Sequence, residues 1–425
     1  MMKIVKRPSI KNKEVKLILD REASPSPEIQ STVMGILSDV KENGISAVES
    51  YAKKFDGLKG NLKVSSKELE KAAALVKPNI KRAIDKAIIN VKRFHKHQME
   101  KSWSISGPDG EQLGQRIRPL KRVGVYIPGG SGVYPSTVIM NVVPALVAGV
   151  SEIVAVSPPL KGFHPAVAYA LHKLGVSEIY KVGGAQAIGM LAYGAGKVKK
   201  VDKIVGPSSP YASVAKKEVF GLVDIDMVAG PSEILVMFDE TADPDWVAAD
   251  ILSQAEHGSG FEAAIGVTTS LQAAKWVQEC VQEQVENSPK REALELVLKK
   301  FGRIFVVDDW DKGSDLVNHI APEHLEIITL DAKKLSLRIE NAGAIFIGPW
   351  SSEPIGDYFA GPNHVLPTNG TARFFSPLGV YDFLKRTSII EYSHQAIQKN
   401  GKLIAELADE EGFSHHAMAV RKRLN

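Results

Sequence analysis

Four short apolar segments decide the fold of this chain: RVGVYIPGG at 122–130, SEIVAVSPP at 151–159, EIYKVGG at 178–184 and VDKIVGP at 201–207. Each is rich in β-branched residues and ends in glycine or proline, which is typical of a short buried strand that runs into a turn. Two helix-compatible stretches, PSTVIMNVVPALVAG and PAVAYALHKLG, separate the first three segments. Strands that alternate with helices predict βαβ units and a mostly parallel sheet.

A second group of alternating elements follows the first. A helix is predicted to begin near Asp243, in DPDWVAADILSQAEHG. Five further strands are predicted in IDMVAGPSEILVMF, AAIGVTTS, GRIFVVDD, LEIITL and GAIFIGP. The predicted fold class is therefore α/β, with two Rossmann-like parallel-sheet domains and additional helical segments at the N- and C-termini.

The chain of 425 residues is longer than one hydrophobic core usually holds, so more than one domain is expected. The charged segment from Pro27 to Met99 has apolar residues at helical spacing and predicts a helical layer. We assign 1–119 to the N-terminal strand and helical part of a catalytic domain, 120–235 to a nucleotide-binding α/β domain, 236–375 to the catalytic α/β domain with a metal site, and 376–425 to a helical C-terminal segment.

Composition excludes several classes of protein. Lys and Arg number 53 against 49 Asp and Glu, and a net charge of +4 is too small to indicate a nucleic-acid surface. The single cysteine, Cys280, excludes an internal disulfide and a cysteine-rich zinc finger. No apolar run reaches about 18 residues and the N-terminus has no signal-peptide core, so we expect a cytoplasmic protein that does not bind membranes.

The predicted strands of the first sheet end in glycines, at Gly129-Gly130, Gly183-Gly184 and Gly206. Parallel sheets bind ligands beyond the carboxyl ends of their strands, so a nucleotide could lie across these glycines. The GxGxxG fingerprint of dinucleotide-binding proteins is absent, however. Glycine-ended strands by themselves are equally typical of tight turns, and this alternative stays open from the pattern alone.

Two clusters of polar residues could hold a metal or perform acid–base chemistry. In DILSQAEHGSG, Gln254 and His257 are three residues apart and would share one face of a helix, where both could reach one cation. In APEHLEI, Glu323 and His324 precede an apolar strand and could act as a general acid and base. Helix capping for the first pair and a solvated loop for the second are the alternatives.

Two further clusters lie toward the C-terminus. GDYFAGPNHVLPTNG contains Asp357 and His364 in a segment rich in glycine and proline, which predicts an ordered loop. EEGFSHHAMAVRKR contains Glu411, His415 and His416. Any of these residues alone could be ordinary surface. The four clusters together offer Gln, His, Asp and His, which would complete a nitrogen and oxygen shell for zinc.

The clusters, in this order and with these spacings, resemble the histidinol dehydrogenase family. The resemblance covers essentially the whole chain and does not depend on one motif. The matching segments include RVGVYIPGG, YPSTVIMNVVPA, EIYKVGGAQAIGMLAYG, IDMVAGPSEILV, LSQAEHG, APEHLEI, GDYFAGPNHVLPT, ARFFSPLGVYDFLKRTSII and a closing H-x-x-A-V-x-x-R pattern.

The resemblance implies a role for each of these residues. It assigns Glu323 and His324 to catalysis. His416 rather than His415 matches a zinc ligand, because it lies three residues before Ala419 in the closing pattern. The implied zinc ligands are Gln254, His257, Asp357 and His416, and the implied substrate contacts are Ser136, Ser232, Gln254, His257, His324, Asp357, His364, Glu411 and His416.

Tyr126, Gln186 and Ser209 match the family's NAD-binding positions. The third departs from the family pattern, because the chain has Ser208-Ser209 where the family normally has glycine and asparagine. Serine keeps a hydrogen-bonding group with a shorter reach, and the conformational freedom of the glycine is lost. The choice between NAD and NADP is therefore left open.

The resemblance implies an NAD- and zinc-dependent oxidation of L-histidinol through L-histidinal to L-histidine, the last step of histidine biosynthesis. It also implies a homodimer in which the C-terminal segment of one subunit completes the active site of the other. Two alternatives remain: a paralogous dehydrogenase that acts on another polar alcohol, and a zinc hydrolase in which Glu323 activates water.

Overall fold

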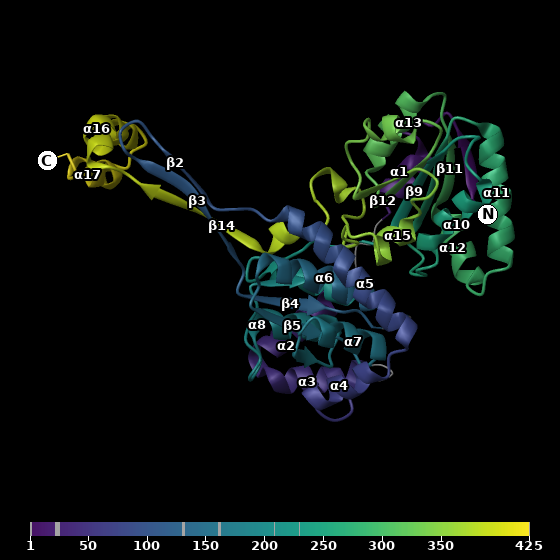
Figure 1. Ribbon diagram of the computed structural model, residues 1–425, viewed down its shortest axis with the longest axis horizontal. Helices are drawn as coiled ribbons and strands as arrows, with labels where there is room; N and C mark the ends of the chain where they lie inside the picture. Colours follow the sequence, from purple (N-terminus) through teal and green to yellow (C-terminus); the bar gives the residue numbers. More distant parts are fainter. Residues whose placement is uncertain are drawn as a thin grey trace.

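The computed structural model describes residues 2–21, 26–129, 132–159, 163–207, 209–228 and 230–424. It consists of two lobes, each built on one parallel sheet, and an arm that projects away from both lobes (Figure 1). The predicted α/β class with two parallel sheets is confirmed.

The first lobe contains a five-stranded parallel sheet. Its order is β6-β5-β4-β7-β8, so the chain begins in the middle, moves to one edge and then crosses to the other half. This doubly wound order places a topological switch point between β4 and β7. The strands are β4 (Arg122–Tyr126), β5 (Glu152–Val156), β6 (Glu178–Tyr180), β7 (Lys203–Val205) and β8 (Asp224–Ile225).

Helices cover both faces of this sheet and form two separate apolar cores. One face carries α4 (Ser66–Ala74), α5 (Pro78–His95), α6 (Pro135–Ala148) and α7 (Pro165–Lys173). The other carries α2 (Pro27–Asn43), α3 (Ile45–Phe55), α8 (Gly184–Tyr193) and α9 (Pro210–Val219). Helices α6 and α7 coincide with the two helices predicted between the first strands.

The N-terminal region is divided between the lobes. Strand β1 (Lys3–Lys6) pairs with the second sheet, and α1 (Lys13–Leu19) packs in that lobe. Helices α2 to α5 pack instead on the first lobe, through contacts with α6, α7, α8 and α9. Residues 1–119 were assigned to the catalytic domain, but only β1 and α1 pack with the second sheet. The apolar faces of α2 to α5 are covered by the helices of the first sheet.

The second lobe contains a six-stranded parallel sheet in the order β1-β11-β10-β9-β12-β13. From β9 to β13 it repeats the doubly wound order of the first sheet, with a switch point between β9 and β12. Its other strands are β9 (Glu233–Phe238), β10 (Ala263–Thr268), β11 (Gly302–Val306), β12 (His324–Ile328) and β13 (Ala344–Ile347). All five strands predicted from the second group of segments are present.

Helices also cover both faces of the second sheet. One face carries α10 (Pro244–Ala255), α11 (Leu271–Glu286) and α12 (Arg291–Phe301); the other carries α1, α13 (Trp310–Ile320) and α14 (Ala332–Ser336). The short α15 (Glu353–Tyr358) follows β13. In the part of the chain that the structure describes, no helix is long and apolar enough to cross a membrane.

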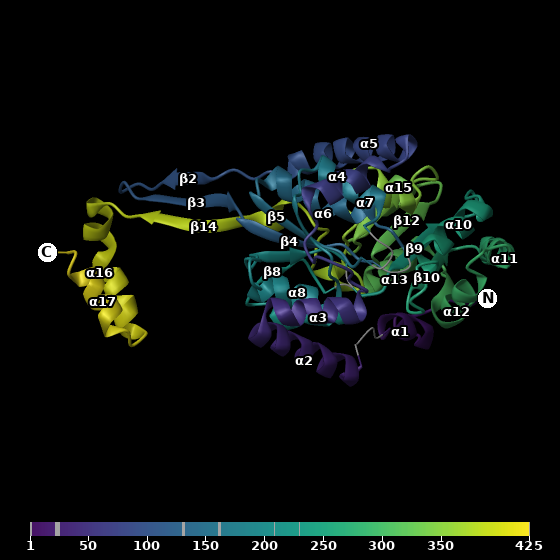
Figure 2. The same ribbon diagram turned by 90° about the horizontal axis from the view of Figure 1, so that it is seen from below.

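The arm is an antiparallel sheet tipped by two helices (Figure 2). Strands β2 (Trp103–Ser106), β3 (Gln112–Pro119) and β14 (Leu384–Glu391) form the sheet in the order β14-β3-β2. Helices α16 (His394–Glu410) and α17 (Ser414–Arg421) form its tip. The C-terminal helices were predicted, but the strands were not: most of their side chains are exposed, β2 is only four residues long, and β14 has no alternating apolar pattern.

Candidate active site

The predicted catalytic pair lies at the amino end of β12, beside β9 at the switch point of the second sheet. Glu323 and His324 are both buried. His324 Nδ1 lies 3.1 Å from the backbone oxygen of Glu233, which indicates that Nδ1 carries the hydrogen and donates it. The other ring nitrogen, Nε2, is buried with no hydrogen-bond partner among the described residues. It is therefore free to accept a proton.

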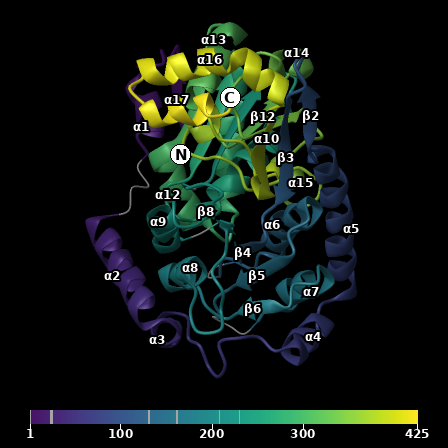
Figure 3. The ribbon, with the colours of Figure 1, turned by 90° about the vertical axis from the view of Figure 1, so that its left-hand side faces the viewer.

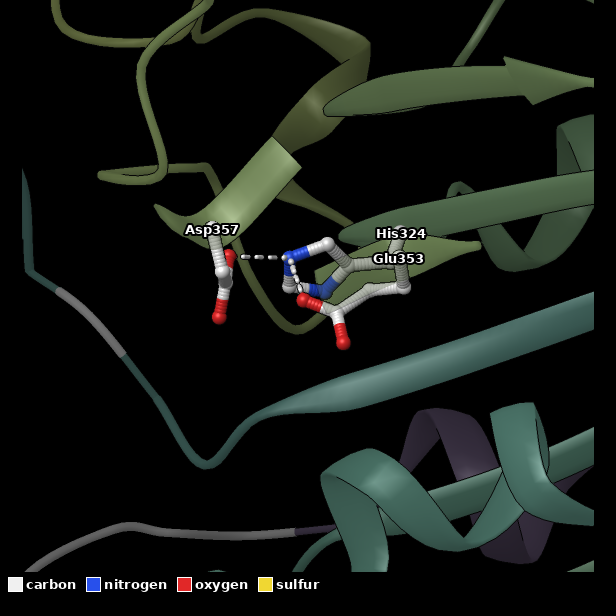
Figure 4. A group of neighbouring side chains, drawn as sticks. All are labelled: His324, Glu353 and Asp357. Atoms are coloured by element: carbon white, nitrogen blue, oxygen red, sulfur yellow. Dashed lines mark ion pairs between the residues drawn. The ribbon is translucent and has the colours of Figure 1, made fainter. Parts of the chain in front are cut away.

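Helix α15 brings two carboxylates to this free nitrogen (Figure 4). Glu353 and Asp357 are one helical turn apart and so project from the same face. Glu353 Oε1 lies 3.6 Å from His324 Nε2, and Asp357 Oδ1 lies 3.5 Å from it. One ligand atom from each of the three residues lies within 4.8 Å of the others, close enough to hold one metal ion.

Helix α10 contributes the next two predicted residues. Gln254 lies in its last turn and is buried, and its Oε1 atom has no partner among the described residues. His257 lies two residues beyond the end of the helix, so the two residues do not share a helical face as predicted. A turn joins them instead, in which His257 N–H donates to Gln254 O over 3.3 Å. Ser232 Oγ lies 3.1 Å from His257 Nδ1.

His364 reaches the same site from the segment that joins the lobes. Its Nδ1 atom lies 4.0 Å from Asp357 Oδ1, and its Nε2 atom is buried without a partner in the described chain. Asn363 Nδ2 donates to Met140 O on α6 over 2.6 Å, and Asn90 Nδ2 on α5 donates to Phe359 O over 2.9 Å. These bonds fix the segment against the first lobe, so the site lies where the two lobes meet.

Burial and crowding shift the titration of these groups. Burial raises the pKa of Glu323 to about 8 and that of Glu353 to about 7. Burial lowers the pKa of His324, but the charges of Glu323 and Asp357 outweigh it and raise that pKa to about 10. Burial raises the pKa of Asp357, but His324 and His364 outweigh it and lower that pKa to about 2. At neutral pH these acids keep His324 protonated unless a cation pairs with them, so the site attracts a cation. A cation bound at Asp357 would cancel that attraction and leave His324 neutral, as a general base must be.

The donor atoms of the site fit a zinc ion. Among the described residues, Gln254 Oε1 and Glu353 Oε1 are buried without a hydrogen-bond partner, and unsatisfied polar atoms are costly unless a ligand or metal meets them. His257 is exposed, yet desolvation by nearby protein atoms lowers its pKa, an effect that Asp357 opposes. A neutral imidazole with carboxylate and amide oxygens is a nitrogen and oxygen donor set that suits zinc.

The three predicted cofactor residues gather at the carboxyl ends of β4, β6 and β7. Tyr126 Oη accepts a hydrogen bond from Gly184 N over 3.0 Å and is also hydrogen-bonded to Ser209. Gln186 Nε2 donates to Asp56 Oδ2 over 3.0 Å, and Gly183 N donates to the same oxygen over 3.0 Å. Asp56 was not predicted from the sequence, because a lone aspartate after a helix has no motif.

The loop after β7 is shaped by a glycine and a helix cap. Gly206 has a φ of +116°, and a Cβ there would lie 2.2 Å from Tyr126 O, so only glycine fits. Ser209 is the N-cap of α9, where its Oγ accepts from Ala212 N over 3.4 Å, and Pro210 occupies the first turn. Ser208 lies outside the described residues. Ser209, which replaces the family's asparagine, thus serves as the N-cap of α9.

Of the remaining predicted residues, those at the tip of the arm do not reach this site within one chain. Ser136 lies buried in the first turn of α6, in the first lobe. Glu411 caps α16 and His416 lies on α17, and both are exposed at the tip of the arm, as is His415. Figure 3, which looks along the arm, shows these helices in front of the lobes, and Figure 1 shows them at the end of the molecule opposite α10 and α15.

Comparison with known proteins identifies the family of this chain. Residues 19–424 match the family model for histidinol dehydrogenase. The chain belongs to the histidinol dehydrogenase family. It is 49% identical to the histidinol dehydrogenase of Geobacillus kaustophilus over 94% of this chain and 95% of that protein, and 48% identical to that of Bacillus subtilis over 96% of each. The predicted family is confirmed, and a dehydrogenase is an oxidoreductase.

A solved structure has the same architecture. The crystal structure of histidinol dehydrogenase from Elizabethkingia anophelis superposes with a TM-score of 0.93 at 36% identity, and covers 100% of this chain and 98% of that one. Both lobes and the arm fall within this superposition. The arm is therefore a feature of the histidinol dehydrogenase fold and not of this sequence alone.

Glu353, beside His324 at the candidate site, was missed by sequence reasoning. Glu353 lies in GPWSSEPIGDYF, directly before Pro354. The signal was present, because proline favours the first turn of a helix and a helix there would place Glu353 four residues before Asp357 on one face. The predicted loop began only at Gly356, and its first three residues, among them Asp357, lie instead in α15.

Proposed function

We propose that this chain oxidises L-histidinol through L-histidinal to L-histidine with two molecules of NAD. The observation that carries the proposal is the position of His324: its free Nε2 lies beside Asp357, and Glu323 is buried next to it. In this proposal the lobe of the five-stranded sheet binds the nucleotide, and the lobe of the six-stranded sheet carries the catalytic residues.

Zinc is the proposed metal, held by Gln254, His257 and Asp357 with His416 of the partner subunit. When bound, it would accept the imidazole and amino nitrogens of histidinol as ligands and so orient the hydroxymethyl carbon. Residues of both subunits are proposed to hold the polar groups of the substrate. Ser136, Ser232 and His364 come from the same chain, and Glu411 of the partner subunit completes the set.

His324 is the proposed general base for both oxidations. Its Nδ1–H is held by Glu233 O, which leaves Nε2 oriented to take the proton of the substrate hydroxyl as hydride leaves the carbon for NAD. The aldehyde formed is then hydrated to a gem-diol. The gem-diol loses its second hydride to a second NAD, and His324 again takes the hydroxyl proton.

Glu323 is the proposed base for the hydration step. Burial raises its pKa to about 8, so the ionised Glu323 carboxylate is a stronger base toward water than the carboxylate of an exposed glutamate. A thioester route through cysteine has no support, because Cys280 lies on α11 against the core of the second lobe, and burial raises the pKa of its thiol. Retention of the aldehyde therefore depends on the closed site and not on a covalent bond.

NAD is proposed to bind across the carboxyl ends of β4, β6 and β7. Tyr126, Gln186 and Ser209 meet there around Asp56, close to the switch point of the first sheet. Ser209 already caps α9, so the amide of Gln186 is expected to contribute more to NAD affinity. NAD rather than NADP is proposed from the family.

A homodimer is proposed, in which the arm of each subunit reaches the active site of the other. The support is the exposure of Glu411 and His416 at the tip of an arm that lies far from its own site (Figure 2). Apolar residues are also exposed along the arm, among them Trp103, Ile105 and Ile390. Exposed apolar surface of this kind is typical of an interface with a second copy.

The proposal is tested by adding histidinol to the zinc-loaded enzyme with NAD or NADP and following NADH absorbance and histidine together. Two NADH per histidine supports it. Turnover of another amino alcohol but not histidinol would favour a paralogous dehydrogenase. Hydrolysis of amides with no absorbance change would favour a zinc hydrolase, and either result would overturn the proposal.

A further inference from the structure

Arg21 is a buried charge in the second lobe that none of the proposed functions explains. It follows α1 in the N-terminal segment and is about 300 residues away in sequence from the catalytic pair. Its side chain is 1% exposed, and so is almost completely removed from water. A buried guanidinium is destabilising unless it is paired, so its partner is the informative contact.

That partner is Glu233, the first residue of β9. Arg21 Nη2 lies 2.6 Å from Glu233 Oε2, and the Glu233 side chain is 2% exposed. The same nitrogen donates to Asn369 Oδ1 over 2.9 Å. The guanidinium also stacks over the ring of Phe301, at 5.9 Å from its centre. Arg21 is thus fixed by a charge, a neutral acceptor and an aromatic face.

Glu233 connects this ion pair to Glu323 by two reciprocal hydrogen bonds. The backbone N–H of Glu323 donates to Glu233 Oε1 over 3.2 Å. In return, the backbone N–H of Glu233 donates to Glu323 Oε2 over 2.9 Å. Asn369 N–H donates to Glu233 Oε1 as well, over 2.9 Å. The carboxylate that Arg21 neutralises therefore holds the backbone N–H of Glu323, while the backbone oxygen of Glu323 accepts from Ala344 N over 2.9 Å.

His324 depends on Glu233 in a different way. Its Nδ1 contacts the backbone oxygen of Glu233, not the side chain. That oxygen belongs to β9, which is paired on both sides, with β10 and with β12. Loss of the Arg21 charge would leave the Glu233 carboxylate buried and unpaired, and would displace the side chain more readily than the strand.

We propose that Arg21 is a positioning residue for Glu323, acting through the Glu233 carboxylate. This inference rests on the proposed function of Glu323 as the base that hydrates the aldehyde. Arg21 itself does not touch the substrate. Its loss should slow formation of histidine from the aldehyde while leaving the first oxidation, which depends on His324, largely intact.

The chain offers a matched control in Arg303, on β11. Arg303 Nε lies 2.8 Å from Glu14 Oε2, with side chains 6% and 10% exposed. This is also a buried ion pair between the N-terminal segment and the second sheet, but neither residue contacts Glu233 or the catalytic pair in the described structure. Replacing Arg303 should disturb packing of the N-terminal segment without moving Glu323.

The experiment measures single-turnover oxidation of histidinol, counting the first NADH, trapped aldehyde and histidine in the zinc-loaded enzyme. In Arg21→Met we expect the first NADH to form within about threefold of the wild-type rate, histidine to form at least about tenfold more slowly, and aldehyde to accumulate. In Arg303→Met the ratio of the two rates should stay at the wild-type value even if thermal stability falls. Arg21→Lys keeps the charge and should lie between Arg21→Met and wild type.

An equal loss of both rates in Arg21→Met, or the same change of ratio in Arg303→Met, would overturn the proposal. If Arg21→Met does not fold, Arg21→Lys decides: an unchanged ratio of rates overturns it and a raised ratio supports it. Failure of the proposed function is distinguishable, because then Glu323→Gln would not accumulate aldehyde either. Aldehyde accumulation in Glu323→Gln with a wild-type ratio in Arg21→Met would refute only the positioning role.

Discussion

His324 Nε2 lies 3.5 Å from Asp357 Oδ1, so the proposed base and a proposed metal ligand belong to one site. The two residues come from different elements, β12 and α15. The imidazole is oriented by the backbone of β9 on its other side. A substrate bound at Asp357 would therefore meet a proton acceptor whose direction is already fixed by the sheet.

Replacing a metal ligand should abolish activity while leaving the fold intact. In His257→Ala and Asp357→Ala we expect loss of histidinol oxidation and of bound zinc, with the free energy of unfolding of the metal-free protein changed by about 1 kcal/mol or less. These side chains contact the site and not the apolar cores. Zinc content by elemental analysis and urea unfolding are the measurements.

The control for these variants is His172→Ala, an exposed histidine on α7 in the other lobe. It should keep both zinc and activity. Full activity of the wild-type protein after removal of metal by a chelator would contradict the proposed role of zinc.

Gln186→Ala should weaken NAD binding more than Ser209→Ala. The Gln186 amide is fixed by Asp56 at the proposed cofactor site, whereas Ser209 already uses its hydroxyl to cap α9. Ser209→Ala should instead reduce the free energy of unfolding by about 1 kcal/mol, the usual cost of losing an N-cap. Calorimetric titration with NAD and thermal unfolding separate the two effects.

The Ser209→Asn variant shows what the departure from the family pattern does. Tighter NAD binding with unchanged turnover would mean that Ser209 weakens NAD binding without affecting catalysis. Loss of activity would mean that the cofactor pose has adapted to it. A larger loss of NAD affinity in Ser209→Ala than in Gln186→Ala would contradict the prediction.

Two inactive variants should restore activity when their subunits are mixed, if each active site is built from two chains. In His257→Ala the lobe is defective, and in His416→Ala the arm is defective. After unfolding and refolding together, half of the dimers are hybrids with one intact site each, so roughly a quarter of wild-type activity should return. His415→Ala should be active by itself. No recovery in the mixture, with dimers formed, would contradict the shared site.

Folding stability should fall below neutral pH because of His95 on α5. This residue is 0% exposed, its Nδ1 lies 2.8 Å from Val91 O, and burial lowers its pKa. Below the ordinary pKa of about 6.5 the unfolded chain therefore binds a proton that native His95 does not, and the free energy of unfolding decreases as pH falls. Above that pH His95 is neutral in both the folded and the unfolded chain, so it causes no loss of stability there.

The measurement is urea unfolding of wild type and His95→Gln at about pH 7.5 and about pH 5.5. The wild type should lose more stability than the variant between the two values, because glutamine does not titrate. Equal losses in both proteins would assign the pH dependence to other groups.

Most of both sheets could be predicted from the sequence because their strands are buried on both faces. β9 and β10, for example, contain the nearly continuous apolar runs ILVMF and AAIGV, each followed by polar residues, which is a clear local pattern. β14 shows the opposite case. Its residues are largely exposed within one chain, so the alternation that marks a strand is absent.

The candidate site was predictable only in part, and for a similar reason. Glu323, His324, Gln254 and His257 lie in short motifs. Asp56, Glu233 and Arg21 do not, because each acts through a partner at least 90 residues away, and no local spacing encodes that contact. Long-range polar networks such as these become visible only in the folded chain.

The most direct test of the account is the single-turnover behaviour of Glu323→Gln. The amide cannot accept a proton from water, but it leaves His324 able to act as base in the first oxidation. We predict one NADH per active site at nearly the wild-type rate, accumulation of aldehyde, and histidine formation slowed by on the order of a hundredfold or more. His324→Gln should lose both oxidations. Two NADH per histidine at an undiminished rate in Glu323→Gln would contradict the assigned roles.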